Sequence, residues 1–180
     1  METFEARIQR PAKAGDKSPW AFVVLPVEAS ATLPRRGRTT VAGAINGQPF
    51  QVLAEPDGRK SHWLRLDQAL LEAAGAEPGK TAHFSIRPVK PEPEPFVPPD
   101  LEAALARSPA ARATWAQTTA VARVDWIHWI ESARQDATRA KRIADACDML
   151  SSGKRRVCCF DPSGVYSKAF CAPAHDTGQD

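Results

Sequence analysis

Four residues in the second half of the chain have side chains that could bind an anion. They lie in the stretch DWIHWIESARQDATRAKRI, residues 125–143, and are Arg134, Thr138, Arg139 and Arg142. Guanidinium groups, a hydroxyl group and the free amides of a helix start are donors that suit a carboxylate or a phosphate. The alternative is structural, because the bases could pair with Glu131 and Asp136 across a tight helical corner while Thr138 only caps a helix. Both interpretations stay open.

Two tryptophans and a histidine interleave in the same stretch. Trp126 and Trp129 are expected to anchor the packing of helices or domains, and stacking on a ligand is the alternative. His128 lies between them, and as a general base it would need a nucleophile and an orienting partner within hydrogen-bond reach. No serine or cysteine in the sequence is obviously paired with it. We therefore expect His128 to be a surface histidine.

A second pair of this kind, His62 and Trp63, follows a turn in the first half of the chain. Period-two alternation puts His62 and Leu64 on one face of a strand and Trp63 on the other. One face could point into a barrel, where a small ligand pocket could form at the mouth. The alternative is that Trp63 covers a barrel end.

Two clusters of basic residues are candidates for phosphate or nucleic-acid contact. They are Arg35, Arg36 and Arg38, and Lys154, Arg155 and Arg156. The first cluster is expected to be a solvated loop, since no aromatic residues that could stack on bases interleave with it. The second follows the expected end of a helix, where cations stabilise the negative end of the dipole. Nucleic-acid binding through these residues is the second function considered, and it predicts a steep salt dependence.

The chain carries no motif of a known enzyme class. A phosphate-binding glycine loop, a zinc-protease histidine pair and a nucleophile elbow are all missing from the sequence. Three cysteines and a histidine near the C-terminus could ligate zinc, but adjacent cysteines are poor tetrahedral partners, so we expect no metal and no cofactor. These residues are Cys158, Cys159, Cys171 and His175. An unrecognised enzyme would need a concave site that joins His62 or His128 to a nucleophile.

The bulk composition is that of an ordinary globular protein. The chain has 180 residues, 43% of them hydrophobic and 25% charged, with a net charge of +3. This composition supports a core without metals or disulfides, and the charge is too small to indicate nucleic-acid binding by itself. No apolar run approaches the roughly 20 residues that span a bilayer. The first ten residues carry charges where a signal peptide needs an apolar segment, so we expect a cytoplasmic protein.

The positions of the prolines divide the chain. Residues 87–100, RPVKPEPEPFVPPD, hold the densest run, and proline suits neither a helix interior nor a central strand. We expect a stiff, extended linker at residues 89–99. It separates a domain at residues 1–88 from a helical domain at residues 100–156, and residues 157–180 are expected to be an irregular tail.

The first domain is expected to be a small six-stranded β-barrel with one short helix. Apolar residues alternate with polar ones in several short segments, which is typical of half-buried strands. Asn46-Gly47 has the chemistry of a two-residue hairpin turn, and Pro49 just after it indicates an edge position or a bulge. The segment from Asp67 to Gly75 reads as a helix, with the aspartate as N-cap.

The second domain is expected to be a short helical bundle, which makes the fold class α+β. Asp100 is expected to cap the first helix, and Ser108 with Pro109 to start the second. A third helix is predicted for about residues 120–134. Asp136 or Thr138 is expected to start a fourth, which Gly153 ends.

Both halves resemble known bacterial families. The segments LPRRGRTTVAGAINGQPFQ and LDQALLEAAGAEPGKTAHF resemble an N-terminal barrel domain of unknown function, and residues 125–155 resemble the bacteriocin-protection, YdeI or OmpD-associated family. The matching pairs in the helical part are Trp129-Ile130, Ala133-Arg134, Thr138-Arg139 and Gly153-Lys154. Arg134 stands where a lysine is expected, and Thr118-Thr119 where the family has leucine and serine. The resemblance implies a fold and an association with stress or peptide resistance, without an established chemistry.

These observations favour a non-catalytic binding protein. The expected partner is a small anionic ligand or a peptide, and a link to antimicrobial-peptide resistance is what the resemblance implies. The candidate ligand residues are Arg134, Thr138, Arg139, Arg142, Trp126, Trp129, His62 and Trp63. Nucleic-acid binding and an unrecognised enzyme are the alternatives, and no interaction with a membrane is expected.

Overall fold

The computed structural model describes residues 1–13, 19–157 and 171–176. The chain divides into two compact units, each described by itself below. The barrel unit comprises Met1–Lys90 together with Phe170–Asp180, and the helical unit comprises Pro91–Ala169. The barrel unit therefore contains residues from both ends of this sequence.

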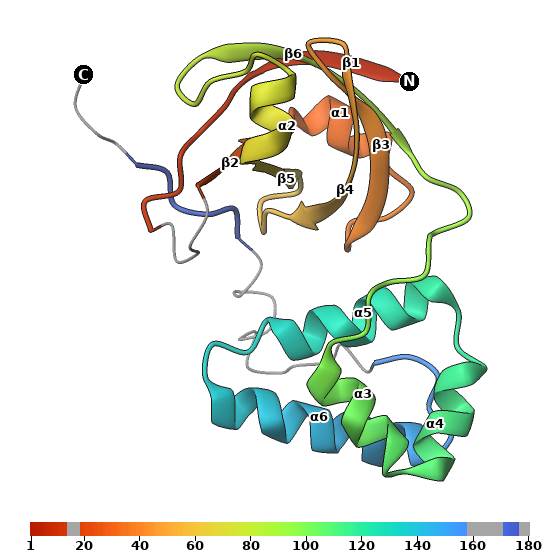
Figure 1. Cartoon of the computed structure of the whole chain (residues 1–180). Coiled ribbons are helices and arrows are strands. Elements are labelled where there is room, and N and C mark those ends of the chain that lie inside the picture. The colour runs from red at the N-terminus through yellow and green to blue at the C-terminus, as the bar shows by residue number, and fades with distance from the viewer. Residues whose placement is uncertain (14–18, 158–170, 177–180) are drawn as a thin grey trace. The chain divides into compact units, whose positions relative to one another are not determined.

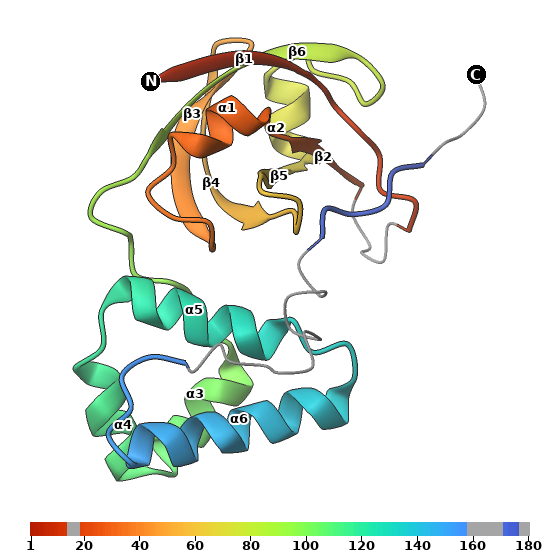
Figure 2. The same ribbon diagram turned by 180° about the vertical axis from the view of Figure 1, so that it is seen from behind.

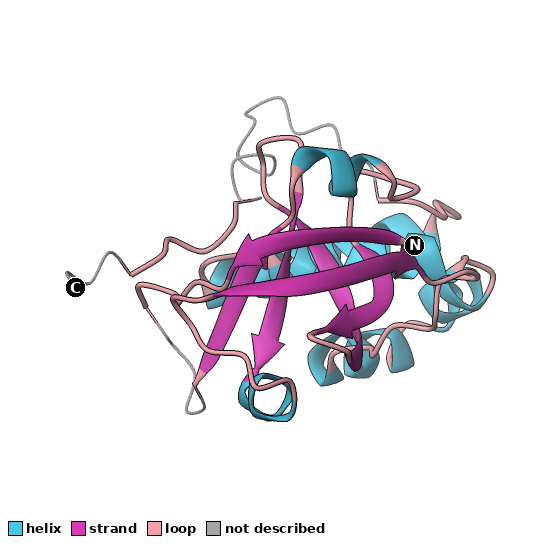
Figure 3. Ribbon diagram, turned by 90° about the horizontal axis from the view of Figure 1, so that it is seen from above, coloured by secondary structure: helices cyan, strands magenta, loops and turns pink. Residues whose placement is uncertain are grey.

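Six antiparallel strands form one curled sheet in the barrel unit (Figure 1). Their order is β1-β6-β3-β4-β5-β2. The strands are β1 (Glu2–Arg7), β2 (Trp20–Val24), β3 (Thr39–Ile45), β4 (Gln48–Pro56), β5 (His62–Asp67) and β6 (Thr81–Pro88). In Figure 3 the strands are magenta and the helices cyan. A six-stranded barrel-like sheet followed by helices confirms the predicted α+β class.

A single β-bridge joins the two outer strands of this sheet. The chain continues past β1, and the Gln9 amide donates to the Phe22 carbonyl oxygen at 2.8 Å. The Phe22 amide donates in return to the Gln9 carbonyl oxygen at 2.9 Å. These two hydrogen bonds turn the open sheet into a closed ring of strands, because Phe22 belongs to β2.

The hairpin between β3 and β4 has the predicted turn. Asn46 and Gly47 have φ of 48° and 88°, the positive values that a type I′ turn requires. Pro49 pairs with Ala44 of β3, whereas the pairing of β4 with β5 covers Ala54–Pro56 alone. At Pro49, β4 therefore pairs with β3 on one side and with no described strand on the other. The missing amide proton of Pro49 breaks no hydrogen bond of the ladder.

Two short helices lie at opposite ends of the curled sheet. Figure 1 has α2 (Gln68–Ala73) in front, and Figure 2, seen from behind, has α1 (Val27–Ala31) in front. Asp67 caps α2 as predicted, since its side chain accepts from the Leu70 amide at 2.8 Å. Helix α1 was not predicted; it begins after Pro26 and has five residues.

The interior of the barrel unit is apolar. The inward-facing residues of neighbouring strands alternate with exposed ones, as in the pattern of β6, and helix residues Ala29 and Leu71 complete the core. Each large apolar side chain that is fully buried stabilises the fold by about 1.5–3 kcal/mol. The fully buried strand residues include Val23, Val41, Ile45, Leu64, Leu66 and Ile86.

The helical unit contains four longer helices. They are α3 (Pro99–Ala106), α4 (Pro109–Ala116), α5 (Ala120–Glu131) and α6 (Asp136–Ser151). Pro98, not Asp100, occupies the N-cap of α3, and Asp100 lies in the first turn. Helix α5 ends three residues before the predicted Arg134, and α6 begins at Asp136, with Gln135 as N-cap. None of the described helices has the length and apolar character that crossing a bilayer requires.

The core of the helical unit is built around Trp126. This side chain is completely buried, and its ring packs edge-on against Trp129 with 6.2 Å between ring centroids. The Trp126 indole nitrogen is buried and has no hydrogen-bond partner among the described residues. Leu101 and Leu150 are also completely buried in the same cluster. Trp126 and Trp129 are therefore packing residues, as the first of the two interpretations predicted.

One glycine in β3 is required by close packing against the neighbouring strand. A Cβ atom at Gly43 would lie 1.7 Å from the Ser85 carbonyl oxygen. We expect Gly43→Ala to lower the free energy of unfolding by about 3 kcal/mol, since the backbones must separate. Gly47→Ala in the same hairpin has open space and strains φ alone, so about 1 kcal/mol is expected. Urea unfolding measures both, and equal losses would contradict this account.

Candidate functional site

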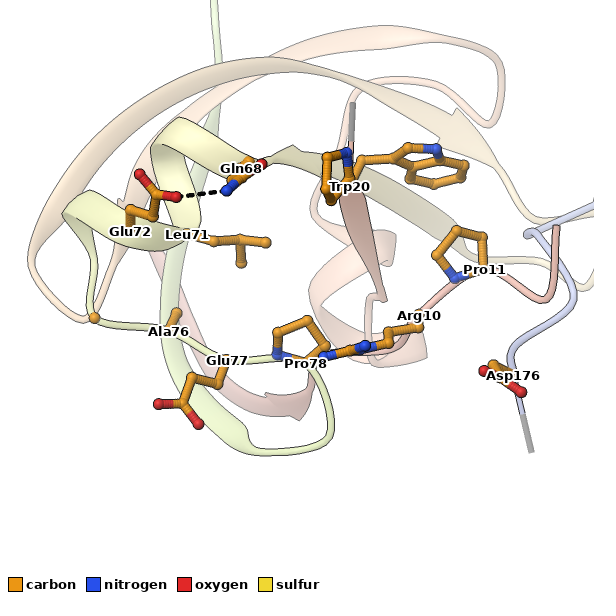
Figure 4. A pocket seen from close by; sticks show the side chains of 12 residues that line it. Arg10, Pro11, Trp20, Gln68, Leu71, Glu72, Ala76, Glu77, Pro78 and Asp176 are labelled. Atoms are coloured by element: carbon orange, nitrogen blue, oxygen red, sulfur yellow. Dashed lines mark hydrogen bonds between the residues drawn. The ribbon is translucent and has the colours of Figure 1, made fainter. Parts of the chain in front are cut away.

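A cavity lies at the end of the barrel unit beside α2 (Figure 4), and we call it the barrel-end cavity. Its volume is about 640 Å³. Pockets for small molecules span about 300–1,000 Å³ and combine apolar walls with a few polar groups. The lining residues are Arg10, Pro11, Pro19, Trp20, Gln68, Leu71, Glu72, Gly75, Ala76, Glu77, Pro78 and Asp176.

Four segments of the chain bring these residues together. Arg10 and Pro11 follow the bridge that closes the sheet, and Trp20 begins β2. On α2 the lining residues Leu71 and Glu72 come three and four positions after Gln68, so both lie on the helix side of Gln68. Gly75 ends the helix with φ of 57°, which turns the chain into the loop that carries Ala76 to Pro78.

Arg10 is the cationic residue among the described residues that line the barrel-end cavity. In Figure 4 its side chain extends from the backbone toward Pro78, across from Leu71. Its guanidinium group has no hydrogen bond or ion pair with another described residue. A guanidinium group beside apolar walls offers a planar pair of donors, which suits a carboxylate.

All three acids that line the cavity among the described residues have an interaction of their own. Glu72 accepts a hydrogen bond from the Gln68 amide at 2.6 Å. Glu77 pairs with Lys80 at 2.7 Å, and the hydrogen bond from Lys80 lowers the pKa of Glu77. In Figure 4 Glu77 points away from the other lining side chains. Among the described lining residues, Arg10 is therefore the charged residue that has no ion pair or side-chain hydrogen bond.

Trp20 forms the aromatic wall of the cavity. The Arg65 guanidinium carbon lies 4.3 Å from the centroid of the Trp20 ring, and Trp63 lies 6.5 Å away, centroid to centroid. The Trp20 indole nitrogen is buried without a hydrogen-bond partner among the described residues. Trp63 therefore packs with Trp20 and Phe22, and is not itself a lining residue of the cavity.

The predicted anion-binding stretch forms a helical corner. The side chain of Arg142 holds this corner together through three contacts, which we call the Arg142 clamp. Its guanidinium group donates to the Trp129 carbonyl oxygen and, at 2.7 Å, to the Ser132 hydroxyl. It also lies 5.5 Å from the centroid of the Trp129 ring. These groups end α5, so Arg142 satisfies helix-end acceptors.

Arg139 is paired within the helical unit. Its guanidinium group donates to both carboxylate oxygens of Asp100, at 2.7 and 3.0 Å. The hydrogen bond from Arg139 lowers the pKa of Asp100, and the same pair raises the pKa of Arg139. Arg134 is exposed and Thr138 half-buried, and neither side chain has a hydrogen bond or ion pair with another described residue. An anion site at this corner stays a prediction, with two of its three arginines held by protein groups.

His62 is a buried structural residue. It is 2% exposed, and its Nδ1 lies 2.7 Å from the Ser30 hydroxyl while its Nε2 lies 3.1 Å from the Gly37 carbonyl oxygen. A neutral ring that donates from Nε2 and accepts at Nδ1 satisfies both contacts. Burial lowers the pKa of His62. The histidine thus ties α1 to the loop before β3, and neither it nor Ser30 lines the barrel-end cavity.

The two basic clusters are partly engaged. Arg38 pairs with Glu55 at 2.7 Å, and Arg155 donates to the Gln117 side chain at 2.7 Å. Arg35 is half-buried, and the exposed members of the clusters are Arg36, Lys154, Arg155 and Arg156. Nucleic-acid contact through them stays a prediction.

The predictions for His128 and for the cysteines near the C-terminus can also be compared with the structure. His128 is 6% exposed, so the expected surface position is wrong; it lies on the packed side of α5. Cys158 and Cys159 lie outside the described residues, while Cys171 is exposed and His175 belongs to a backbone bridge. No three metal-ligating side chains gather anywhere in the described ranges.

The sequence did not reveal the barrel-end cavity. Its residues come from positions 10 to 78 and from position 176, and no motif connects them. One available signal was the expected end of α2 at Gly75, because loops that follow a capped helix at a sheet end commonly border pockets. Arg10 carries no signal that distinguishes it from the other exposed bases.

Loss of the Arg142 clamp should destabilise the helical unit. Arg142→Met removes the charged donor to the Ser132 hydroxyl and to the Trp129 carbonyl, which keeps only the Ser132 hydroxyl at 2.9 Å, so the free energy of unfolding should fall by about 1–3 kcal/mol. Arg134→Met, at an exposed position of the same corner, should stay within about 0.5 kcal/mol of the parent. Urea unfolding followed by tryptophan fluorescence compares them. Equal stability of the two variants would contradict this structural role, and Arg142 would again be a candidate for ligand binding.

The lowered pKa of His62 makes stability depend on pH. The unfolded state binds the proton near pH 6.5 and the folded state only at lower pH, so the free energy of unfolding should fall as pH drops below 6.5. One proton limits the slope to about 1.4 kcal/mol per pH unit. His62→Gln should reduce this slope. Urea unfolding at several pH values measures it; an unchanged slope in His62→Gln would refute the assignment.

Comparison with known families covers most of the chain. Residues 4–86 match the model of the domain of unknown function DUF1905. Residues 94–153 match the model described as bacteriocin-protection, YdeI or OmpD-associated. No curated protein matches the chain. The resemblance predicted from the sequence is confirmed: the barrel of this chain matches the model of the DUF1905 family, and its helical part matches the model of the bacteriocin-protection, YdeI or OmpD-associated family.

Proposed function

We propose that the protein is a non-catalytic binding protein that takes a small carboxylate with an apolar body in the barrel-end cavity. The observation that supports this function is the Arg10 guanidinium group, which has no partner among the described residues and lines a cavity of about 640 Å³. Apolar walls from Trp20, Leu71 and Pro78 would bury the body of the ligand. A single charge-assisted contact would orient its carboxylate.

Binding accounts for the arrangement better than catalysis does. The histidine–hydroxyl pair of the barrel unit, His62 and Ser30, is buried and occupied by its own hydrogen bonds. The described residues that line the cavity include acids, one arginine and a glutamine, and no histidine, cysteine or serine. The description of the matching family mentions bacteriocin protection, and we propose that ligand binding serves such a protective role.

The test compares a carboxylate with its neutral analogue. Calorimetry at low salt should show phenylacetate binding to the parent protein and phenylacetamide binding much more weakly. Arg10→Gln should weaken phenylacetate binding by about tenfold to a hundredfold, since a hydrogen bond to a charged group contributes about 1.5–3 kcal/mol. Arg36→Gln, an exposed base in the same unit, should bind as the parent does.

Three results would count against this function. Equal affinities for phenylacetate and phenylacetamide would exclude recognition of the carboxylate. Unchanged binding in Arg10→Gln would place the site elsewhere, and a loss in Arg134→Gln would place it at the helical corner. Binding of an oligonucleotide with a steep salt dependence that weakens in Arg36→Gln would favour the nucleic-acid alternative.

A further inference from the structure

The segment Ala174–Asp176 lies as an added strand beside residues 10–12. The Ala12 amide donates to the Ala174 carbonyl oxygen at 2.7 Å, and the Asp176 amide donates to the Arg10 carbonyl oxygen at 2.8 Å. Between these bonds Pro11 and His175 form an antiparallel bridge. The three residues, which we call the latch segment, therefore belong to the barrel unit although more than 160 positions separate them from their partners in the sequence.

The alternating direction of the backbone groups along residues 8–12 explains why the latch segment pairs with residues 10–12 in this register. The backbone groups of Ile8 bond to Lys80 and Gly79 at one edge, and those of Gln9 bond to Phe22 at the other. Successive residues of an extended chain face opposite edges, so Arg10 and Ala12 face the edge of Ile8. Pro11 faces the edge of Gln9, and its missing amide proton therefore breaks no bond to the latch segment.

The latch segment touches the barrel-end cavity at two points. Asp176 is one of the lining residues, and Figure 4 shows it beside the strand that carries Arg10 and Pro11. The Asp176 amide also bonds to the backbone of Arg10, whose guanidinium group lines the same cavity. Docking of the latch segment thus fixes the main chain of the residue that would hold the ligand.

We propose that the latch segment is coupled to the cavity, so that a carboxylate bound at Arg10 stabilises the docked segment and the docked segment strengthens binding. This inference rests on the proposed function. The described backbone attachment of the latch segment consists of two hydrogen bonds, and so short a pairing opens locally without unfolding the barrel. A ligand that contacts the closed form better than the open one shifts the equilibrium toward closure. The coupling is reciprocal, so both effects have the same magnitude.

The first readout is hydrogen exchange at single amides in the full chain, measured by NMR with and without saturating phenylacetate. The Ala12 and Asp176 amides should exchange at least about fivefold more slowly with the ligand. The Phe22 amide, which belongs to the bridge that closes the sheet, is the reference and should change less. This measurement uses the parent protein, so it does not depend on how a variant folds.

The second readout is affinity in two variants of one residue. Asp176→Pro removes the amide donor to Arg10 and should weaken phenylacetate binding by about fivefold to tenfold. Asp176→Asn keeps the donor and removes the charge, so its affinity should equal or exceed that of the parent. Reciprocity requires the loss in Asp176→Pro to match the factor by which the ligand slows exchange at Ala12.

The outcomes separate the two proposals. If phenylacetate does not bind the parent protein, both are overturned. If it binds through Arg10 but leaves exchange at Ala12 and Asp176 unchanged, the coupling alone is overturned. Parent-like affinity in Asp176→Pro overturns the coupling as well, because the cavity then works without the docked segment.

Discussion

The two hydrogen bonds between Gln9 and Phe22 are the constraint on which the barrel unit depends. They join the two outermost strands, β1 and β2, so no edge of the sheet is left entirely unpaired at that point. They also fix which edge each following residue faces. The backbone groups of Arg10 and Ala12 face away from β2, which places both beside the latch segment.

Local patterns predicted most of the barrel, because buried and exposed residues alternate along strands such as β5 and β6. The Asn46-Gly47 turn and the Asp67 cap depend on chemistry within four residues, and both appear as expected. Helix α1 escaped prediction, since five residues after a proline are too few for helical periodicity to show. Its place is set by tertiary contacts, among them the hydrogen bond from Ser30 to His62.

The candidate site was harder to predict than the fold. The arginines at the helical corner were recognised from their spacing, but their actual partners are non-local. Arg139 binds Asp100, which is 39 positions away, and Arg142 binds a backbone carbonyl at the end of α5. A sequence shows neighbours along a helix and cannot show such contacts. The barrel-end cavity has the same origin, because Arg10, Leu71 and Asp176 meet only in the folded chain.

The position of the latch segment has a consequence for biosynthesis. Translation produces the strands first, the helical unit next and Ala174–Asp176 last, so a nascent chain can close its barrel while one wall of the cavity has not yet been made. A ribosome that stops within the helical unit would release a folded barrel with an incomplete cavity. This wall of the cavity can therefore be complete only after the helical unit has been translated.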